Sequence, residues 1–210
     1  MKVLVIGANG NTGYQLTRIL AKGAHDPVAM IRDPGQRPRF DALGVPTVLG
    51  DLEYPIDHAV NGCDAVIFAA GSGPKTGKDK TVLIDHIGAI RSAVTAQVQG
   101  CSRFIMLSSI NADPESESPI AHYHRAKGLA DDFLRGTDLD WTIVRPGRLH
   151  DAEFPGTADF RLETHGKYQT SRETLAHTLA ACLDEPDTVR LQFAVVDGEG
   201  PFPEGMRGLG

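Results

Sequence analysis

Cysteine is scarce in this chain. Its three cysteines among 210 residues lie far apart, at Cys63, Cys101 and Cys182. An odd number of cysteines without a Cys-x-x-Cys pair excludes a disulfide framework and a cysteine-rich zinc site. Isolated thiols of this kind are usually buried, in proteins of reducing compartments. We therefore expect a cytoplasmic protein.

The sequence also lacks long apolar runs and a surplus of basic charge. No run reaches the roughly 18 apolar residues of a membrane-spanning helix, and the apolar run at 2–6 is shorter than the core of a signal peptide. With 21 Lys and Arg against 27 Asp and Glu, the net charge is -6, whereas nucleic-acid binders usually carry a basic surplus. The eight histidines show no metal-ligand spacing. We expect a small-molecule substrate, a monomer or homodimer, and no membrane, nucleic-acid or metal partner.

Glycine, by contrast, is abundant, with 23 residues placed mostly between apolar runs. Short apolar runs alternate with longer segments of helical spacing, which predicts βαβ units around a mainly parallel sheet. Strands are expected at 2–6, 27–31, 46–49, 65–70, 103–107, 141–144 and 191–196, and helices at 12–22, 81–98, 120–134 and 172–183. We predict one α/β domain over residues 1–210, with a doubly wound, Rossmann-like sheet in three α/β/α layers.

Two segments fall outside this alternation. Residues 149–170 are predicted to form an insert that acts as a lid or small C-terminal substrate region. Residues 198–210, rich in glycine and proline, are expected to be irregular. Doubly wound sheets bind ligands beyond the carboxyl ends of their strands. Side chains that directly follow strands are therefore the first candidates for function.

The strongest motif is Gly7-Ala8-Asn9-Gly10-Asn11-Thr12-Gly13, which follows the first strand and opens the first helix. In this GxxGxxG pattern, Gly7 permits a sharp turn, Gly10 lets backbone N–H groups approach a pyrophosphate, and Gly13 lets the helix pack closely on the sheet. The positive end of the helix dipole then faces the phosphates. We assign dinucleotide binding to Gly7, Asn9, Gly10, Asn11, Thr12 and Gly13.

Arg32 indicates which dinucleotide is bound. It follows the second strand, where NAD-binding proteins carry an acidic residue for the ribose hydroxyls. A guanidinium at this place matches a 2′-phosphate with paired donors. Asp33 comes one position later and is still able to reach a ribose. We therefore predict NADP as the cofactor, with NAD as the less favoured alternative.

Further cofactor contacts are expected after the third and fourth strands. Asp51 is placed to bond the adenine amino group and Leu52 to cover the ring. The small residues Ala69, Ala70 and Gly71 allow the cofactor to approach the backbone. In the glycine-rich stretch that follows, Lys75 is a candidate for a phosphate contact.

A second set of residues carries acid–base chemistry. Tyr123 and Lys127 are four positions apart and share one helix face, and Ser109 follows the fifth strand. The ammonium of Lys127 lowers the pKa of a nearby phenol and also holds the nicotinamide ribose. The hydroxyl of Ser109 binds the substrate oxygen. Such a set moves a proton while a cofactor moves a hydride, so we predict Ser109, Tyr123 and Lys127 as the catalytic residues.

Several motifs together resemble a known family: GANGNTG at the first turn, IRD after the second strand, then FIMLSS, YHRAK and WTIVRPG. They are similar to those of atypical short-chain dehydrogenase/reductases, and more narrowly of small bacterial NAD(P)-binding, epimerase/dehydratase-like proteins. The resemblance covers nearly the whole chain and implies a Rossmann fold, NAD(P) binding and the roles named for Ser109, Tyr123 and Lys127. One position departs from the family pattern. Active members often carry an Asn that supports a water beside the Lys, and this chain has Asp85 there.

The resulting functional prediction is an NADP-dependent reductase or dehydrogenase of a small carbonyl, quinone or flavin-like substrate. Asp85 keeps a second hypothesis open, a non-catalytic NADP-binding sensor. A third is an NAD(P)-dependent epimerase or isomerase, although the region after Arg145 is short for a sugar-nucleotide site.

Overall fold

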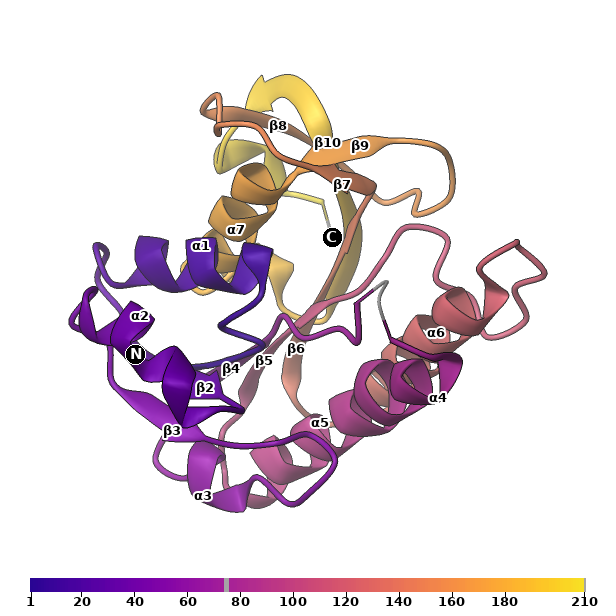
Figure 1. The fold of residues 1–210 in the computed structure, drawn as a ribbon. Coiled ribbons are helices and arrows are strands. Elements are labelled where there is room, and N and C mark those ends of the chain that lie inside the picture. The colour runs from indigo at the N-terminus through magenta and orange to yellow at the C-terminus, as the bar shows by residue number, and fades with distance from the viewer. Residues whose placement is uncertain (74–75, 210) are drawn as a thin grey trace.

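An eight-stranded sheet forms the middle layer of the molecule, whose computed structural model describes residues 1–73 and 76–209 (Figure 1). The strands follow the order β3-β2-β1-β4-β5-β6-β10-β8. Their bounds are Lys2–Ile6 (β1), Asp26–Ile31 (β2), Thr47–Leu49 (β3), Ala65–Phe68 (β4), Arg103–Leu107 (β5), Asp140–Pro146 (β6), Thr157–Arg161 (β8) and Leu191–Pro201 (β10). All neighbours pair in parallel except β10 and β8. The strand order reverses between β1 and β4, which is where doubly wound sheets hold their ligands.

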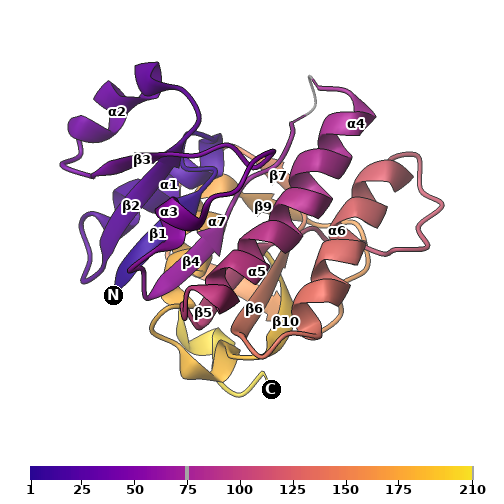
Figure 2. The same cartoon turned by 90° about the horizontal axis from the view of Figure 1, so that it is seen from below.

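Helices cover both faces of the sheet (Figure 2). One face carries α1 (Asn11–Leu20), α2 (Arg37–Asp41) and α7 (Arg172–Ala181), and the other carries α3 (Asp57–Val60), α4 (Lys78–Lys80), α5 (Ala89–Val98) and α6 (Ala121–Arg135). These are the three layers of the predicted Rossmann-like fold, and the prediction of fold class is confirmed.

The central strands are buried on both faces because successive side chains point to opposite layers. In β1, Val3 and Val5 join the apolar cluster that contains Leu16 of α1, whereas Leu4 and Ile6 join the cluster beneath α5 and α6. A continuous apolar run is therefore what a strand at this place requires.

The helix expected at 81–98 has an unexpected beginning. It starts with α4, continues as a π-helical segment over Thr81–Gly88, and becomes regular only in α5. Ile84 and Asp85 of the π-helical segment are both buried, with Asp85 fully enclosed. π-Helical turns are rare and are often found at functional sites.

The segment 149–170 contains more regular structure than the sequence indicates. β7 (Arg148–His150) pairs in parallel with β9 (Gln169–Ser171) as a separate two-stranded sheet. Between them, β8 returns to the main sheet and pairs with β10 as its outermost strand. Only the residues around these strands remain irregular, so the predicted insert is partly an edge of the main sheet.

The expectation of an irregular tail from residue 198 is wrong. β10 continues to Pro201, and a 3₁₀ turn at Glu204–Met206 follows, with the Met206 side chain buried. Gly198 and Gly200 belong to this strand, and both positions need glycine because β8 lies too close for a side chain. A Cβ atom at Gly198 would lie 2.2 Å from the carboxyl carbon of Asp159, and one at Gly200 would lie 2.6 Å from the Ala158 carbonyl oxygen.

No helix within residues 1–73 and 76–209 is both long enough and apolar enough to cross a membrane. Lys75, the candidate for a phosphate contact, lies outside the described residues.

Candidate active site

The glycine loop joins β1 to α1 and needs its glycines for two different steric reasons. Gly7 has a φ of 83°, and a Cβ atom there would lie 2.6 Å from the backbone of Ala70. At Gly13 a Cβ atom would lie 2.2 Å from the Gly7 carbonyl oxygen, so this glycine serves the packing of α1 and does not line the cleft. The loop therefore holds its shape only if both positions lack a side chain.

The N-terminus of α1 is a suitable place for a phosphate. Its N-cap is Gly10, which offers no side chain to the first N–H groups of the helix. Gly10 also lines both cavities of the cleft, so these donors lie beside open space. Free N–H groups and the positive end of the helix dipole favour an anion at this point. Asn9 is held beside the loop by Arg39, which donates to its carbonyl oxygen at 3.1 Å and to its Oδ1 at 3.0 Å.

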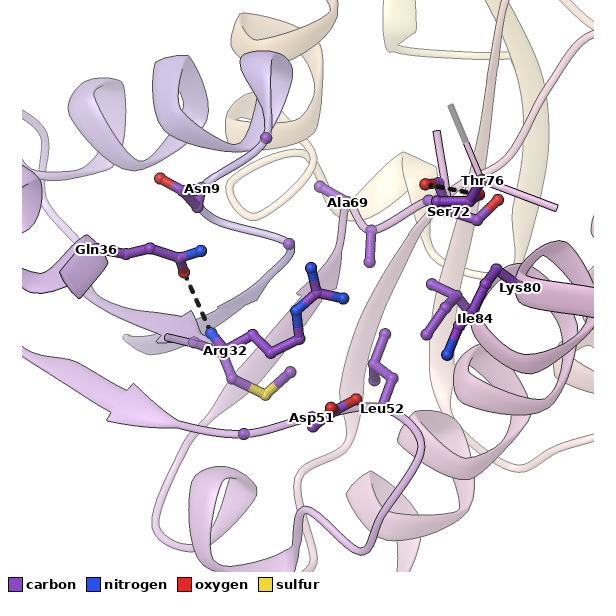
Figure 3. Close-up of a pocket in the computed structure, with 16 residues that line it drawn as sticks. Asn9, Arg32, Gln36, Asp51, Leu52, Ala69, Ser72, Thr76, Lys80 and Ile84 are labelled. Carbon is purple, nitrogen blue, oxygen red and sulfur yellow. Dashed lines mark hydrogen bonds between the residues drawn. The ribbon is translucent and has the colours of Figure 1, made fainter. Parts of the chain in front are cut away.

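A cavity of about 350 Å³ lies between the ends of β1, β2, β3 and β4 (Figure 3). Eight of its lining residues carry sequence-based assignments as cofactor contacts: Gly7, Asn9, Gly10, Asp51, Leu52, Ala69, Ala70 and Gly71. The side chain of Arg32, the ninth, extends into it, and the Arg32 N–H donates to Gln36 Oε1 at 3.2 Å. Arg32 forms no ion pair with any of the described residues, so its guanidinium is available for a phosphate.

The remaining lining of this cavity comes from residues that the motifs do not single out. They are Met30, Gln36, Gly50, Ser72, Thr76, Lys80 and Ile84. Lys80 forms an ion pair with Glu53, which ties α4 to the loop after β3. Asp51 Oδ1 accepts from the Glu53 N–H at 3.0 Å and so shapes the same loop. Position after a strand end could have indicated Gly50 and Ser72, whereas Lys80 and Ile84 lie on helical segments and give no such signal.

A second cavity, of about 530 Å³, adjoins the first through shared walls at Gly10, Ala69, Ala70, Gly71, Ser72 and Thr76. Asn11 and Thr12 line it on the α1 side. On the opposite side it is lined by Ser109, Tyr123 and Lys127, the three residues predicted to be catalytic. The fold therefore brings the acid–base set and the glycine loop to one continuous cleft.

Lys127 and Asp85 form a buried ion pair in the cleft. Lys127 Nζ lies 3.2 Å from Asp85 Oδ1 and donates to the Leu107 carbonyl oxygen at 3.2 Å, and the two side chains are 3% and 0% exposed. Burial lowers the pKa of Lys127, but the charge of Asp85, with smaller contributions from Tyr123 and Asp131, outweighs burial and leaves the pKa raised. Lys127 is therefore held as an ammonium.

Asp85 thus pairs directly with the lysine. Its second oxygen, Oδ2, accepts from the Ser72 N–H at 2.9 Å and connects the pair to the loop after β4. A direct ion pair at this place differs from the water-supporting Asn that the family pattern implies.

Lys127 acts on the pKa of Tyr123 in the expected direction, but the net pKa of this phenol is raised above its ordinary value. Burial raises the pKa of the phenol, and Asp85 raises it further. The Lys127 ammonium and the neighbouring Ser109 hydroxyl act in the opposite direction without reversing the sign. At neutral pH the phenol is therefore protonated, which suits a proton donor.

Behind Ser109 lies a buried network that the sequence analysis missed. Asp131 Oδ2 accepts from Ser108 Oγ at 2.6 Å and from Arg145 Nε and Nη2 at 3.0 and 2.8 Å. Asp131 is 0% and Arg145 5% exposed. Arg145 Nη1 also donates to Thr164 Oγ1 at 3.0 Å, so the end of β5, α6, β6 and the segment after β8 are joined. Partners this distant in sequence leave no spacing signal.

Asn111 provides a second connection to the same segment. Its N–H donates to the Thr164 carbonyl oxygen, and its side-chain amide exchanges two hydrogen bonds with the backbone of Gly166, each at 2.9 Å. Asn111 has a φ of 63°, a conformation that asparagine tolerates better than most residues. The loop that carries Ser109 and the segment that follows β8 are consequently held together.

Residues 1–73 and 76–209 contain no group of three His, Cys, Asp or Glu side chains placed to share a metal ion.

Comparison with known proteins places this geometry in a family. The family model described as NAD(P)H-binding matches residues 7–186. The sugar epimerase YhfK of Bacillus subtilis, whose activity is uncharacterised, is 37% identical over 215 residues, covering 100% of each chain. A solved structure from Bacillus halodurans, of a protein assigned to the NAD-dependent epimerase/dehydratases, is 41% identical with a TM-score of 0.91 and covers 96% of each chain. The ceramide reductase of Caulobacter vibrioides is 30% identical over 185 residues, which span 83% of this chain and 56% of the reductase.

These relatives include reductases as well as proteins named epimerases, and the matched region spans the glycine loop, Arg32, Ser109, Tyr123 and Lys127. The chain therefore belongs to the NAD(P)H-binding family of atypical short-chain dehydrogenase/reductase and epimerase/dehydratase-like proteins.

Proposed function

We propose that the protein is an NADPH-dependent reductase of a small carbonyl, quinone or flavin-like compound. The observation that carries this proposal is the continuous cleft. Its first cavity presents the glycine loop and the guanidinium of Arg32, which has no ion-pair partner among the described residues, and its second presents Tyr123 and Lys127. The arrangement supports a phosphorylated dinucleotide along one side and a small substrate beside the phenol.

The residues fit this cofactor chemically. Backbone N–H groups at the start of α1 suit a pyrophosphate, and Arg32 suits a 2′-phosphate. When bound, the nicotinamide supplies a hydride, that is, two electrons and one hydrogen nucleus. Ser109 holds the substrate oxygen with its hydroxyl, and Tyr123 donates the proton that this oxygen needs to become a hydroxyl. The resulting phenolate faces the Lys127 ammonium and regains its proton from solvent.

The protonation state of Tyr123 is compatible with reduction. Burial raises the pKa of this phenol, so it carries its proton at neutral pH and can donate it to a substrate oxygen. Oxidation of an alcohol would use the phenolate as the base instead.

An epimerase is the second candidate, favoured by the full-length similarity to a protein named a sugar epimerase. Such an enzyme would return its hydride to the substrate and show no net consumption of NADPH. The 530 Å³ cavity next to Tyr123 is the space in which such a substrate would have to turn.

The test has two steps. Binding of NADPH and NADH is measured by thermal shift, since a ligand that binds only the folded state raises apparent stability. NADPH oxidation is then followed with small aldehydes, quinones and flavins, using the wild-type protein, Tyr123→Phe and Tyr54→Phe. Tyr54 is 67% exposed and lines neither cavity, so it is a matched control.

We expect Tyr123→Phe to lower the rate about 10²- to 10⁴-fold, the usual contribution of a general acid, while NADPH binding stays unchanged. Full activity in Tyr123→Phe would refute the role of this phenol. If NADPH binds tightly but none of the tested compounds causes its oxidation, the result would instead support a non-catalytic binding protein. Interconversion of substrate epimers without NADPH loss would support the epimerase.

A further inference from the structure

Arg172 reaches the substrate cavity from an element that the acid–base set does not use. It is the first residue of α7, directly after Ser171, whose side chain accepts from the Thr174 N–H and caps the helix. Arg172 lines the 530 Å³ cavity together with Ser109, Tyr123 and Lys127. A guanidinium thus lies in the same cavity as the proposed proton donor, on the α7 side.

The present partner of Arg172 is weakly held. Arg172 Nη1 donates to Asp151 Oδ1 at 2.7 Å, and the two side chains are 22% and 81% exposed. Such a water-exposed ion pair contributes about 0–1 kcal/mol, so a ligand can replace it at little cost. Among the described residues, Arg172 donates a side-chain hydrogen bond only through Nη1. Its Nε and Nη2 donors have no acceptor there. Asp151 therefore shows how a carboxylate docks on this arginine.

The rest of the cavity explains why a charged group would go to Arg172. The Lys127 ammonium is already neutralised by Asp85 at 3.2 Å. Leu107, Ile120, Pro146 and Leu149 supply an apolar wall. Arg172 is the other cation that lines this cavity, and its partner Asp151 is largely exposed to water. The cavity thus suits a small molecule with an apolar body, a reducible group near Tyr123 and an anionic group at the other end.

Two anions could meet Arg172, because Gly10, Asn11 and Thr12 line the same cavity and the cofactor pyrophosphate belongs near them. The backbone donors of α1 already provide for the pyrophosphate. Asp151, moreover, directly follows β7, whose residue Leu149 lines the substrate wall. The guanidinium is held toward that wall, which favours the substrate as the source of the anion.

We propose that Arg172 binds a carboxylate of the substrate in place of Asp151, so that the preferred substrates are small carbonyl or quinone acids. This proposal rests on the reductase function proposed above. In the reaction NADPH would supply the hydride and Tyr123 the proton that convert a carbonyl to an alcohol; a quinone would become a hydroquinone by taking its second proton from solvent. The carboxylate is unchanged. Arg172 is accordingly a specificity-determining residue and takes no part in proton transfer.

The test compares an acid with its neutral analogue. The probes are 4-formylbenzoate and 4-formylbenzamide as substrates, and the corresponding benzyl alcohols as ligands that need no turnover, measured by calorimetry with the NADP-loaded protein. The variants are Arg172→Gln, Arg172→Lys, Asp151→Asn and the control Arg148→Gln. Arg148 is an exposed arginine of β7 that does not line the cavity.

We expect Arg172→Gln to reduce binding and kcat/KM of the acid about 10- to 100-fold, as loss of a hydrogen bond to a charged group does. The amide should be unaffected, Arg172→Lys should restore part of the binding, and Asp151→Asn should strengthen acid binding because it removes the competitor. Arg148→Gln should behave as wild type.

Equal binding of acid and amide to the wild-type protein would overturn the assignment, even if both are reduced. Weaker NADPH binding in Arg172→Gln, with acid binding intact, would also overturn it and assign the guanidinium to the cofactor. If no compound is reduced but the alcohol acid still binds through Arg172, the anion site stands and the reductase function fails.

Discussion

The two sides of the cleft are built from different materials. On the cofactor side, the turn out of β1 depends on Gly7 and Gly13, and its geometry is set by backbone contacts. On the substrate side, two ion pairs, Lys127 with Asp85 and Arg145 with Asp131, are almost completely enclosed. The glycine side is therefore sensitive to substitutions that add side-chain atoms. The side with buried charges is sensitive to substitutions that remove a charge and leave its partner uncompensated.

The strongest way to break the substrate side is Asp131→Asn. The substitution keeps the shape but leaves Arg145 without its counter-charge, and removing one partner of a buried pair costs about 3–5 kcal/mol of unfolding free energy. Urea unfolding measures this loss. Asp132→Asn is the control because the neighbouring carboxylate is 49% exposed, and we expect it to change stability by less than about 0.5 kcal/mol. Equal stability of the two variants would show that Asp131 is protonated, since burial already raises its pKa.

The matching way to break the cofactor side is Gly13→Ala. The added Cβ atom would lie 2.2 Å from the Gly7 carbonyl oxygen, so α1 must move away from the sheet. Overpacking of this kind costs about 1–3 kcal/mol, and we expect NADPH binding to weaken along with stability. Gly23→Ala is the control, because its Cβ atom would meet its nearest neighbours at an ordinary 3.6 Å. A stable Gly13→Ala variant with normal cofactor binding would contradict the steric argument.

A smaller effect is expected when Arg32, a charge on the otherwise glycine-built side, is removed. Arg32→Ala should weaken NADPH binding about 10- to 100-fold, the usual cost of a lost hydrogen bond to a charged group, and leave NADH binding unchanged. Fluorescence titration with NADPH and NADH gives the two dissociation constants for the wild-type protein and the variant. Arg37→Ala serves as a control, because Arg37 is exposed and does not line the cavity. An equal loss for both cofactors would remove Arg32 from the recognition of the 2′-phosphate.

Asp85→Asn also removes one partner of a buried pair and should lower stability as Asp131→Asn does. Its separate effect, the smallest of the series, is a change in pH dependence. Burial is the main reason that the pKa of Tyr123 is raised, and the Asp85 charge adds to it. Removing that charge lowers the pKa of Tyr123. Reduction needs the protonated phenol and is lost as pH rises through this pKa, so the alkaline limb of the kcat profile should move to lower pH. An unchanged limb, or one displaced to higher pH, would show that Asp85 does not act on Tyr123.

The same division explains what the sequence could predict. The glycine loop, Arg32 and the alternation of strands and helices are local patterns, and the fold places them as expected. β8 and β9 have five and three residues, too few for a periodic signal, and the glycines at 198 and 200 look like a tail unless the strand beside them is known. Asp131 and Arg145 meet only through the fold. The direction of the Tyr123 pKa depends on burial, which no spacing reports.

The π-helical stretch has a consequence for how this site can evolve. α5 is fixed by its packing on the sheet, so the loss of one codon between Asp85 and Ala89 would bring Ile84 to the place that faces Lys127, and the gain of one would bring His86 there. Each residue of a helix turns by about 100°, so one insertion or deletion replaces the partner of the lysine completely. Lineages of this fold can therefore exchange a carboxylate for an apolar or imidazole neighbour by a change in length alone, without mutating either member of the pair.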